Sequence, residues 1–322
     1  MRRLLAAELD PLDIFDEMLR SEEYLTGQDI RGAPIAARFE TALPATARYL
    51  STRLEASDAL CVERYDQAWQ SIFGGIRELV IGQQEYGRVH RKRFHELCNA
   101  IELLCAKCPR PSVIEFGASG FSGIYKALFP SIHLTCADRP YHEDYIGFTE
   151  TNTRRISGCD DYFTVDLNIP LVLSNKEYSG HLARYDIILF TEILEHLTAN
   201  PVDILKQLLA LLAPGGHVYL STPNFFRRDN RAKMAAWENP QEVYPAGDAN
   251  WDAHHHYREY GHKEMLRFIN EAGGQCCAFY FSDCWDGQNA EAFNTYERGN
   301  MVFVIGRHQV CPVAGACEEA TR

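Results

Sequence analysis

Apolar residues in the first third of the chain recur with the spacing of amphipathic helices. The clearest stretch runs from His90 to Cys108, where apolar side chains at i, i+3, i+4 and i+7 form one stripe. Pro109 and Pro111 end this stretch, because proline lacks the amide proton that a helix interior requires. We predict a helical region that also includes weaker helical patterns at residues 12–25 and 59–73.

From residue 112 onward, short apolar runs alternate with helical patterns, which predicts an α/β fold with helices on both faces of a Rossmann-like sheet. The first five runs have the continuous apolar character of buried parallel strands. The last two have no helix between them, and we expect an antiparallel edge pair. The predicted strands are Ser112–Phe116, Ile132–Ala137, Tyr162–Val165, Tyr185–Phe190, His217–Ser221, Gln275–Phe281 and Met301–Ile305. The predicted helices between them are Ser122–Leu128, Pro201–Leu212 and His262–Ala272.

We divide the chain into three parts on these patterns. Residues 1–88 form an α-helical N-terminal extension, residues 89–308 form the α/β domain, and residues 309–322 form a flexible tail. The sequence does not decide whether the extension covers a cofactor or joins two subunits of a homo-oligomer.

Composition narrows the classes of function. The 322 residues are 46% hydrophobic, enough for a full core, and the net charge of −12 argues against broad binding to nucleic acid. No run of 18 apolar residues predicts a membrane span, and the N-terminal apolar run stops at Glu8, too early for a secretory signal. We therefore expect a cytoplasmic protein whose eleven cysteines are reduced. Cys105 and Cys108 form a lone Cys-x-x-Cys on the helical stripe, which favours packing over a zinc or redox site.

A turn rich in small residues follows the first predicted strand. Gly117 and Gly120 allow a sharp turn there, and the next helix offers free amide groups to a ligand. Ligands of open α/β sheets bind at the carboxyl ends of the strands. Asp138 ends the second strand, where an acid is placed to bind ribose hydroxyls. These features suit any adenosine-containing cofactor and do not choose between a dinucleotide and S-adenosylmethionine.

A longer set of motifs occurs in a fixed order along the chain. The set consists of Glu115-x-Gly117, Asp138, Asp166, the Tyr185–Leu197 segment, Leu212-Ala213-Pro214-Gly215-Gly216 and Ser221-Thr222-Pro223-Asn224. Together these motifs resemble the class I S-adenosylmethionine-dependent methyltransferases, which have a seven-stranded sheet. Within that class they are most similar to the branch that includes the ubiquinone-biosynthesis O-methyltransferases. The resemblance covers about residues 112–306.

The resemblance implies where the cofactor lies. Glu115 would order the glycine turn and face the methionine end, Asp138 would hold the ribose, and Asp166 would face the adenine amine. The residues implied to border the cofactor are Glu115, Gly117, Ala118, Ser119, Gly120, Asp138, Arg139, Asp166, Leu167 and Thr191. The chain departs from the family pattern at Ser119 and Phe121, which stand where the second and third glycines are usual.

Glu192, Glu195 and His196 have i, i+3, i+4 spacing, so one helical turn would place them on the same face. Together with a later histidine such as His256, they are residue types that bind Mg²⁺, Mn²⁺, Fe²⁺ or Zn²⁺. The set resembles the small-RNA 2′-O-methyltransferases, in which a Glu-x-x-Glu-His segment and a later histidine hold a metal. The same segment also occurs in other relatives that are not known to use a metal. By analogy with those relatives, His196 would be a general base or a packing residue.

We therefore keep two chemical roles open for these residues. The catalytic candidates are His196, His256 and Glu192, and the metal-ligand candidates are Glu192, Glu195, His196 and His256. The long aromatic-rich insert 223–261 predicts either an acceptor pocket for a ring-shaped or sugar-like molecule or a hydrophobic lid. Arg227, Arg228 and Arg231 would meet an acidic group of the substrate or form a solvated turn.

The expected function is S-adenosylmethionine-dependent O-methylation of a small or medium-sized acceptor with an aromatic, sugar-like or natural-product hydroxyl. A divalent metal assists in one version and is absent in the other. The alternatives are a metal-dependent RNA 2′-O-methyltransferase, a non-catalytic cofactor-binding scaffold, and a nicotinamide-dependent enzyme of similar fold.

Overall fold

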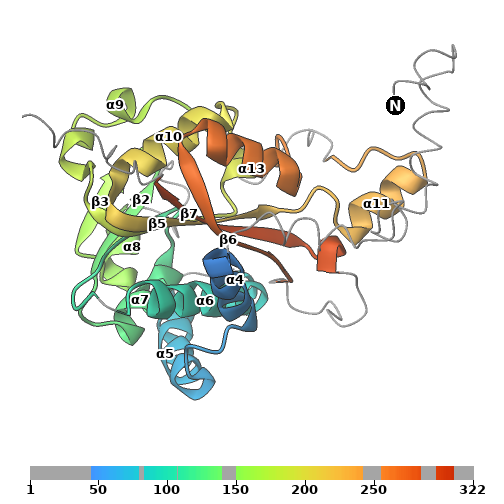
Figure 1. Ribbon diagram of the computed structural model, residues 1–322. Coiled ribbons are helices and arrows are strands. Elements are labelled where there is room, and N and C mark those ends of the chain that lie inside the picture. The colour runs from blue at the N-terminus through green and yellow to red at the C-terminus, as the bar shows by residue number, and fades with distance from the viewer. Residues whose placement is uncertain are drawn as a thin grey trace, which may run out of the picture.

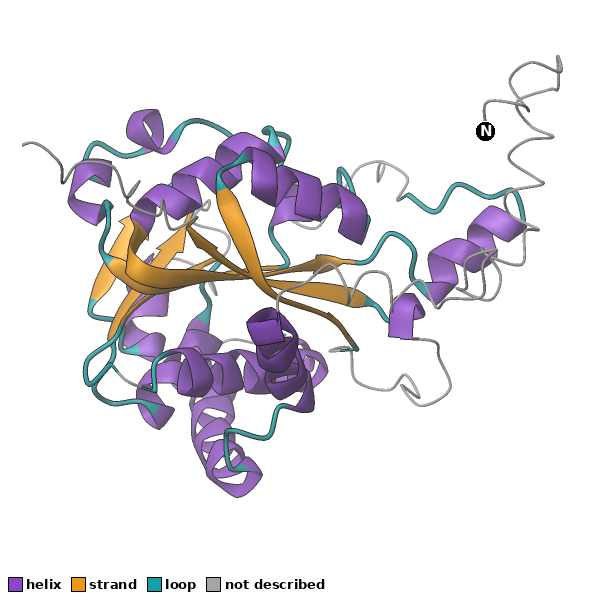
Figure 2. Cartoon of the chain, in the orientation of Figure 1, coloured by secondary structure: helices purple, strands orange, loops and turns teal. Residues whose placement is uncertain are grey.

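The computed structural model describes residues 45–79, 83–106, 108–139, 150–241, 255–283 and 295–307. The expected helix at 12–25 and the expected tail at 309–322 lie outside these residues. Seven strands form one sheet in the order β3-β2-β1-β4-β5-β7-β6, with helices on both faces (Figures 1 and 2). This α/β arrangement confirms the predicted fold class.

All seven predicted strands are present, and in all of them except β3 most residues are buried. Their bounds are β1 Ser112–Phe116, β2 His133–Asp138, β3 Asp161–Thr164, β4 Tyr185–Thr191, β5 Leu212–Pro223, β6 Gly274–Ser282 and β7 Asn300–Arg307. Strands β1 to β5 pair in parallel, and β7 runs antiparallel between β5 and β6, as the missing helix predicted.

Strand β5 begins earlier than the pattern predicted, because it starts directly after helix α10, Pro201–Leu211. Its Pro-Gly-Gly segment lies within the strand, where the register with β4 shifts. Gly216 is needed at this point, since a Cβ there would lie 2.6 Å from the Tyr185 carbonyl oxygen.

The helices form one layer on each face of the sheet (Figure 1). One layer contains α4 Ala45–Ala56, α5 Val62–Leu79, α6 Gln83–Leu104, α7 Gly123–Leu128 and α8 Glu150–Ser157. The other contains α9 Leu171–Ser174, α10 and α13 His262–Glu271. A further helix, α11 Arg228–Ala235, follows β5. No helix among the described residues is long and apolar enough to cross a membrane.

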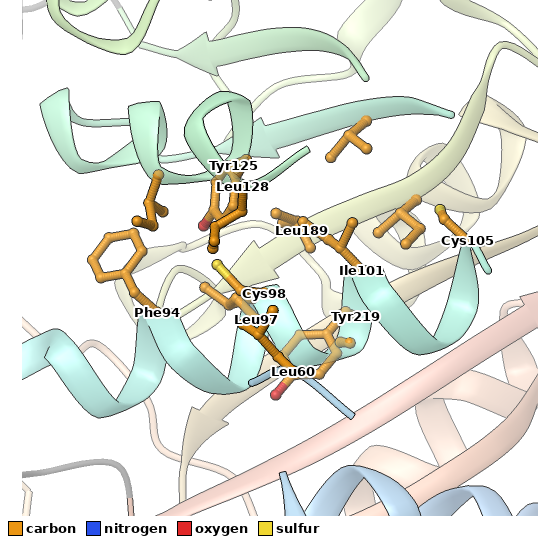
Figure 3. Close-up of a cluster of buried hydrophobic side chains, with 14 of the residues drawn as sticks. Leu60, Phe94, Leu97, Cys98, Ile101, Cys105, Tyr125, Leu128, Leu189 and Tyr219 are labelled. Carbon is orange, nitrogen blue, oxygen red and sulfur yellow. The ribbon is translucent and has the colours of Figure 1, made fainter. Parts of the chain in front are cut away.

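The described N-terminal helices share a core with the sheet. Figure 3 shows Leu97 and Ile101 of α6 beside Leu189 of β4 and Tyr219 of β5, and all four side chains are buried. Strand β6 is tied to α4 by the Phe279 amide, which donates to the Ser51 hydroxyl at 2.9 Å. Helix α6 runs across the expected boundary between residues 88 and 89. The described helices that precede the sheet in the chain are therefore part of one of its covering layers.

Cys105 and Cys108 lie at the end of α6 as free thiols. Cys105 is buried in the core, and that burial raises the pKa of its thiol to about 12. A thiol in this state packs as an apolar side chain and is a poor nucleophile.

Candidate active site

The positions predicted to border a cofactor follow one another across one edge of the sheet. Strands β1, β2 and β4 are adjacent and parallel, so their carboxyl ends meet there. Asp138 is the last residue of β2, Thr191 is the last of β4, and Gly117 follows β1 directly. Gly117 has a φ of +67°, a left-handed conformation that glycine adopts without strain. The fold thus brings sequence-distant residues to the edge where α/β proteins bind ligands.

Glu115 braces the turn that follows β1. Its carboxylate is buried and accepts hydrogen bonds from the Ser122 hydroxyl and, at 2.7 Å, from the Tyr125 hydroxyl. Ser122 also accepts from the Ser119 amide at 3.0 Å, and the Ser119 hydroxyl accepts from the Phe121 amide. Serine at the place of a family glycine is therefore used as a cap for the short helix that begins at residue 120.

Burial raises the pKa of the Glu115 carboxyl to about 7, against the opposing effect of its two hydroxyl donors. Because its pKa is higher in the folded state, this carboxyl contributes its full stabilisation at a pH below its ordinary pKa of 4.5. The contribution is lost as the pH rises through 7. We expect Glu115→Gln to reduce the fall in unfolding free energy between pH 5 and pH 8 by on the order of 2 kcal/mol. Urea unfolding followed by circular dichroism measures this difference.

The exposed substitution Glu177→Gln is the matched control for Glu115→Gln, since residue 177 lies on the surface. It should leave the pH dependence of stability unchanged. Equal pH dependence in wild type and Glu115→Gln would contradict a role for this buried carboxyl.

Phe121 anchors the same turn to the N-terminal helices. Its fully buried ring stacks on Trp69 of α5, with centroids 5.1 Å apart and planes 16° from parallel, and also contacts Phe94 of α6. From the sequence, Phe121 is only a departure from the family pattern, and this contact is not predicted. A large aromatic residue where relatives have glycine was the available signal. The covering helices thereby support the candidate cofactor turn.

The acidic residues after β2 and β3 hold their loops locally. Asp138 is buried, and its Oδ1 accepts from the Arg139 amide at 2.7 Å. Asp166 accepts from the Asn168 amide at 2.9 Å, and Leu167 between them packs partly against the core. These positions are compatible with the ribose and adenine roles that the resemblance implies.

Glu192 lies beyond the end of β4 in a strained conformation, with a φ of +54°. Its two carboxylate oxygens accept hydrogen bonds from Ser221 Oγ at 2.6 Å and Asn300 Nδ2 at 2.7 Å. The helical turn that follows covers only Leu194–His196. The structure therefore does not place Glu192 on one helical face with Glu195 and His196, because β5 and β7 hold its side chain.

Glu195, His196 and His256 form a compact group, with one possible ligand atom from each residue within 4.8 Å of the others. Glu192 is not in this group. Glu195 is 1% exposed, and its Oε2 accepts from Thr222 at 3.0 Å, whereas its Oε1 is buried without a hydrogen-bond partner. Burial is the main cause of a pKa well above the ordinary value for this carboxyl, and the negative charge of Glu192 adds to it.

The two imidazoles of this group are oriented through their Nδ1 atoms. His196 Nδ1 donates to the His255 carbonyl oxygen at 2.9 Å, and His256 Nδ1 lies 3.1 Å from a carboxylate oxygen of Glu259. A proton on Nδ1 puts the lone pair on Nε2, the atom that binds a metal or takes up a proton. His196 Nε2 lies 3.9 Å from Glu195 Oε1. Partners of this kind are the usual way in which proteins fix metal-binding histidines.

Glu259 is a residue that sequence reasoning missed. Burial alone would raise the pKa of its carboxyl, but donors from His256, Arg227 and Asn230 outweigh burial and hold the pKa at about 2. Its spacing of three residues from His256 was the available signal. Arg227 is thus engaged with Glu259, and Arg231 of helix α11 pairs with Glu297. Residues 228–235 thus form a helix in place of a solvated turn, and Arg227 before it and Arg231 within it pair with carboxylates of the chain itself.

The segment that carries His256 is tied directly to the end of β4. The Tyr257 and Arg258 amides donate to the Glu195 carbonyl oxygen at 2.8 and 3.3 Å. The Phe225 amide, which follows β5, donates to the Tyr260 carbonyl oxygen at 3.0 Å. These contacts hold the later histidine beside His196. His254 and the aromatic residues Tyr244 and Trp251 lie outside the described residues.

The residues of the group fit a divalent metal ion. A carboxylate and two imidazoles are suitable ligands, and the buried Glu195 oxygen without a partner would gain one from a cation. The same geometry also suits a general base, because the His255 carbonyl would stabilise a protonated His196.

Comparison with known proteins decides the family. Residues 89–273, more than half of the chain, match the model of a family described as a methyltransferase domain. The chain belongs to the class I S-adenosylmethionine-dependent methyltransferases. The sheet order with an antiparallel β7 accompanies this match, and the cofactor of the family is S-adenosylmethionine.

The methyltransferase is similar over shorter stretches to curated ubiquinone biosynthesis O-methyltransferases. The protein of Acinetobacter baylyi is 30% identical over 33% of this chain and 40% of its own length. That of Vibrio parahaemolyticus is 29% identical over 27% of this chain and 34% of its own length. The chain thus spans less than half the length of these relatives.

Solved methyltransferase structures resemble the chain at low identity. A SAM-dependent methyltransferase of Thermotoga maritima is 13% identical, with 74% of this chain and 99% of that chain covered and a TM-score of 0.43. The trans-methyltransferase CalH in complex with SAH is 18% identical, with 65% and 54% covered and a TM-score of 0.42.

Proposed function

We propose that the protein transfers the methyl group of S-adenosylmethionine to a hydroxyl oxygen of a small or medium-sized acceptor. The observation that carries this proposal is the group of Glu195, His196 and His256 just beyond β4, on the sheet edge where Gly117 and Asp138 lie. A hydroxyl needs help to lose its proton, whereas a thiolate does not, and imidazoles are suited to give that help. The curated relatives named as O-methyltransferases support the same choice of atom.

The chain's own residues would bind and orient the donor. Asp138 would accept hydrogen bonds from ribose hydroxyls, the Gly117–Gly120 turn would lie under the methionine end, and Asp166 with Leu167 would border the adenine. S-adenosylmethionine supplies an activated methyl group on a sulfonium, so the protein needs mainly to align the acceptor and remove its proton.

The imidazoles of His196 and His256 would act on the acceptor hydroxyl. In the version without metal, His196 Nε2 takes the proton, and the His255 carbonyl keeps the ring in position. In the version with metal, Glu195, His196 and His256 hold Mg²⁺, Mn²⁺, Fe²⁺ or Zn²⁺. A bound metal would lower the pKa of the acceptor hydroxyl. Glu192, held by Ser221 and Asn300, would then lie close to the reacting groups without ligating the ion.

A second candidate is a metal-dependent RNA 2′-O-methyltransferase. The observation that favours it is that Glu195 and His196 lie in one group with the later His256. The net charge of −12 counts against it, because phosphate backbones attract basic surfaces.

Transfer of isotope-labelled methyl from S-adenosylmethionine tests both candidates. The protein is incubated with a small-molecule extract or with total RNA, each with EDTA or with added divalent metal. We expect label in the small-molecule fraction and none in RNA. Label in RNA would favour the second candidate, and cofactor binding without transfer to either pool would indicate a non-catalytic scaffold.

A further inference from the structure

A cavity of about 250 Å³ lies between the end of α4, the middle of α6 and the end of β6. Figure 1 shows α4 lying against β6 at this place. Its wall combines aromatic side chains with charged ones, among them Tyr280, Lys92, Asp283 and Arg298. None of these residues has a role in the binding or catalysis described above.

Several polar atoms of the cavity wall are buried without a hydrogen-bond partner. Asp283 is 5% exposed, and both of its carboxylate oxygens are buried and unpaired. Arg298 Nε and His95 Nε2 are in the same state. Buried polar groups are nearly always paired, because an unmet donor or acceptor costs the full desolvation penalty. A ligand that donates to Asp283 and accepts from Arg298 would remove this penalty.

The charges around the cavity nearly balance. Lys92 Nζ donates to the Asp283 carbonyl oxygen at 2.6 Å, and Arg298 Nη1 donates to Glu55 at 2.8 Å. The positive charges of Lys92 and Arg298 also act on the Asp283 carboxylate, so two cations are set against the carboxylates of Asp283 and Glu55. Burial raises the pKa of the neighbouring Glu96 carboxyl to about 7 and lowers the pKa of His95. Both shifts favour the neutral forms, so these two residues add little charge to the cavity. A neutral ligand suits this environment better than an ion.

The hydroxyl groups of a neutral ligand can both donate to the Asp283 carboxylate and accept from Arg298. A hydroxyl both donates and accepts, and two neighbouring hydroxyls can donate to both oxygens of one carboxylate. An ammonium group only donates, so it would leave Arg298 Nε unmet. Tyr280 and Phe281 add apolar atoms to the wall, and the carbon face of a sugar ring packs favourably on aromatic side chains.

The cavity is linked to the candidate active site through two paired strands. The Ser282 hydroxyl at the end of β6 donates to Glu96 at 2.7 Å. Ser282 is the register partner of Asn300 on β7, whose amide donates to Glu192 at 2.7 Å. The negative charge of Glu192 also acts on Glu96. A molecule in the cavity that contacts Ser282 would therefore be connected to Glu192 through the Ser282–Asn300 pair.

We propose that this cavity binds a polyhydroxylated, sugar-like part of the acceptor, with Asp283 as its main hydrogen-bond acceptor. The inference rests on the proposed function and narrows its substrate class. The cavity is large enough for one monosaccharide ring and smaller than the pockets that hold drug-sized ligands.

Saturation-transfer difference NMR on the full chain, saturated with S-adenosylhomocysteine, tests the proposal. The probes are D-glucose, D-galactose, D-mannose and myo-inositol, with benzylamine and benzoate as ring-shaped ions without hydroxyls. We expect at least one polyol to bind with a Kd on the order of millimolar, as befits a ligand of this size. Asp283→Asn should weaken that binding about tenfold or more, because it removes a charged acceptor.

Two further variants make the result specific. His95→Phe keeps a ring but removes Nε2, and it should also weaken polyol binding. Asp58→Asn, an exposed change in the loop after α4, is the matched control and should leave binding unchanged. Circular dichroism and the affinity for S-adenosylhomocysteine confirm that each variant is folded.

The remaining outcomes separate this proposal from the proposed function. Binding of S-adenosylhomocysteine without binding of any polyol would overturn the sugar-like subsite alone. Binding of benzylamine or benzoate in place of the polyols would overturn it in favour of a charged ligand. Equal polyol binding by wild type and Asp283→Asn would place the sugar elsewhere. Failure of S-adenosylhomocysteine to bind would overturn the proposed function and this inference with it.

Discussion

His196→Ala is expected to lower kcat for methyl transfer at least 100-fold while leaving the affinity for S-adenosylhomocysteine within about threefold, as for loss of a general base. The reason is geometric. His196 belongs to the group at the end of β4 and is oriented by the His255 carbonyl, whereas the implied cofactor contacts lie on the turns after β1, β2 and β3. Steady-state kinetics with the acceptor found in the labelling experiment and calorimetric titration with the nucleoside measure the two effects.

His133→Ala is the control for this substitution, because His133 begins β2 at the opposite edge of the sheet and pairs with Asp161. It should change kcat by less than about threefold, since it is remote from the reacting groups. A similarly small effect of His196→Ala would contradict its proposed role.

The His196→Ala variant also distinguishes the version of the reaction with a metal from the version without one. Metal-stripped wild type is titrated with Mg²⁺, Mn²⁺, Fe²⁺ and Zn²⁺ in the presence of S-adenosylhomocysteine. A saturable metal isotherm that His196→Ala abolishes would establish the version with metal. The lack of any isotherm for wild type would leave His196 or His256 as an unassisted base.

Asp138→Ala is expected to weaken binding of S-adenosylhomocysteine about 100-fold. A carboxylate at the end of β2 would accept hydrogen bonds from two ribose hydroxyls, and each bond to a charged group contributes about 1.5–3 kcal/mol. The main-chain hydrogen bonds of Asp138 to its neighbours do not involve the side chain, so the sheet should remain intact. Calorimetric titration gives the affinity directly.

Asp203→Ala serves as the comparison for Asp138→Ala, because Asp203 is exposed on the first turn of α10. Its affinity for the nucleoside should equal that of wild type. If Asp138→Ala bound equally well, the ribose would not lie at the end of β2.

The sheet was predictable from the sequence because its inner strands, such as β1, β4 and β7, are buried on both faces. Runs such as Ile187–Phe190 have no polar residue, and tertiary contacts cannot change such a run into a surface loop. The bounds of β5 were harder to predict. Its early start depends on how Pro214–Gly216 approaches β4, and a glycine-rich segment after a helix equally well predicts a turn.

The candidate site was predictable only as far as local spacing allows. Glu195 and His196 are neighbours, and the resemblance to the small-RNA 2′-O-methyltransferases indicated His256, which the fold brings beside them. The position of Glu192 depends on Ser221 and Asn300, which lie 29 and 108 residues away along the chain. Contacts at such separations leave no periodic signal in a single sequence.

The role of the N-terminal helices shows the same limit. Their amphipathic patterns predicted buried stripes but not the surface that buries them. The stacking of Trp69 on Phe121 reveals the partner, and it makes the N-terminal helices a support for the turn after β1. A large aromatic residue in a glycine-rich turn was uninterpretable until that contact was known.

Parallel calorimetric titrations of the wild-type protein with S-adenosylhomocysteine and with NAD test which cofactor the protein binds. We expect a saturable one-site isotherm for S-adenosylhomocysteine and no heat of binding for NAD. Binding of NAD without binding of S-adenosylhomocysteine would contradict the methyltransferase account and indicate a nicotinamide-dependent enzyme.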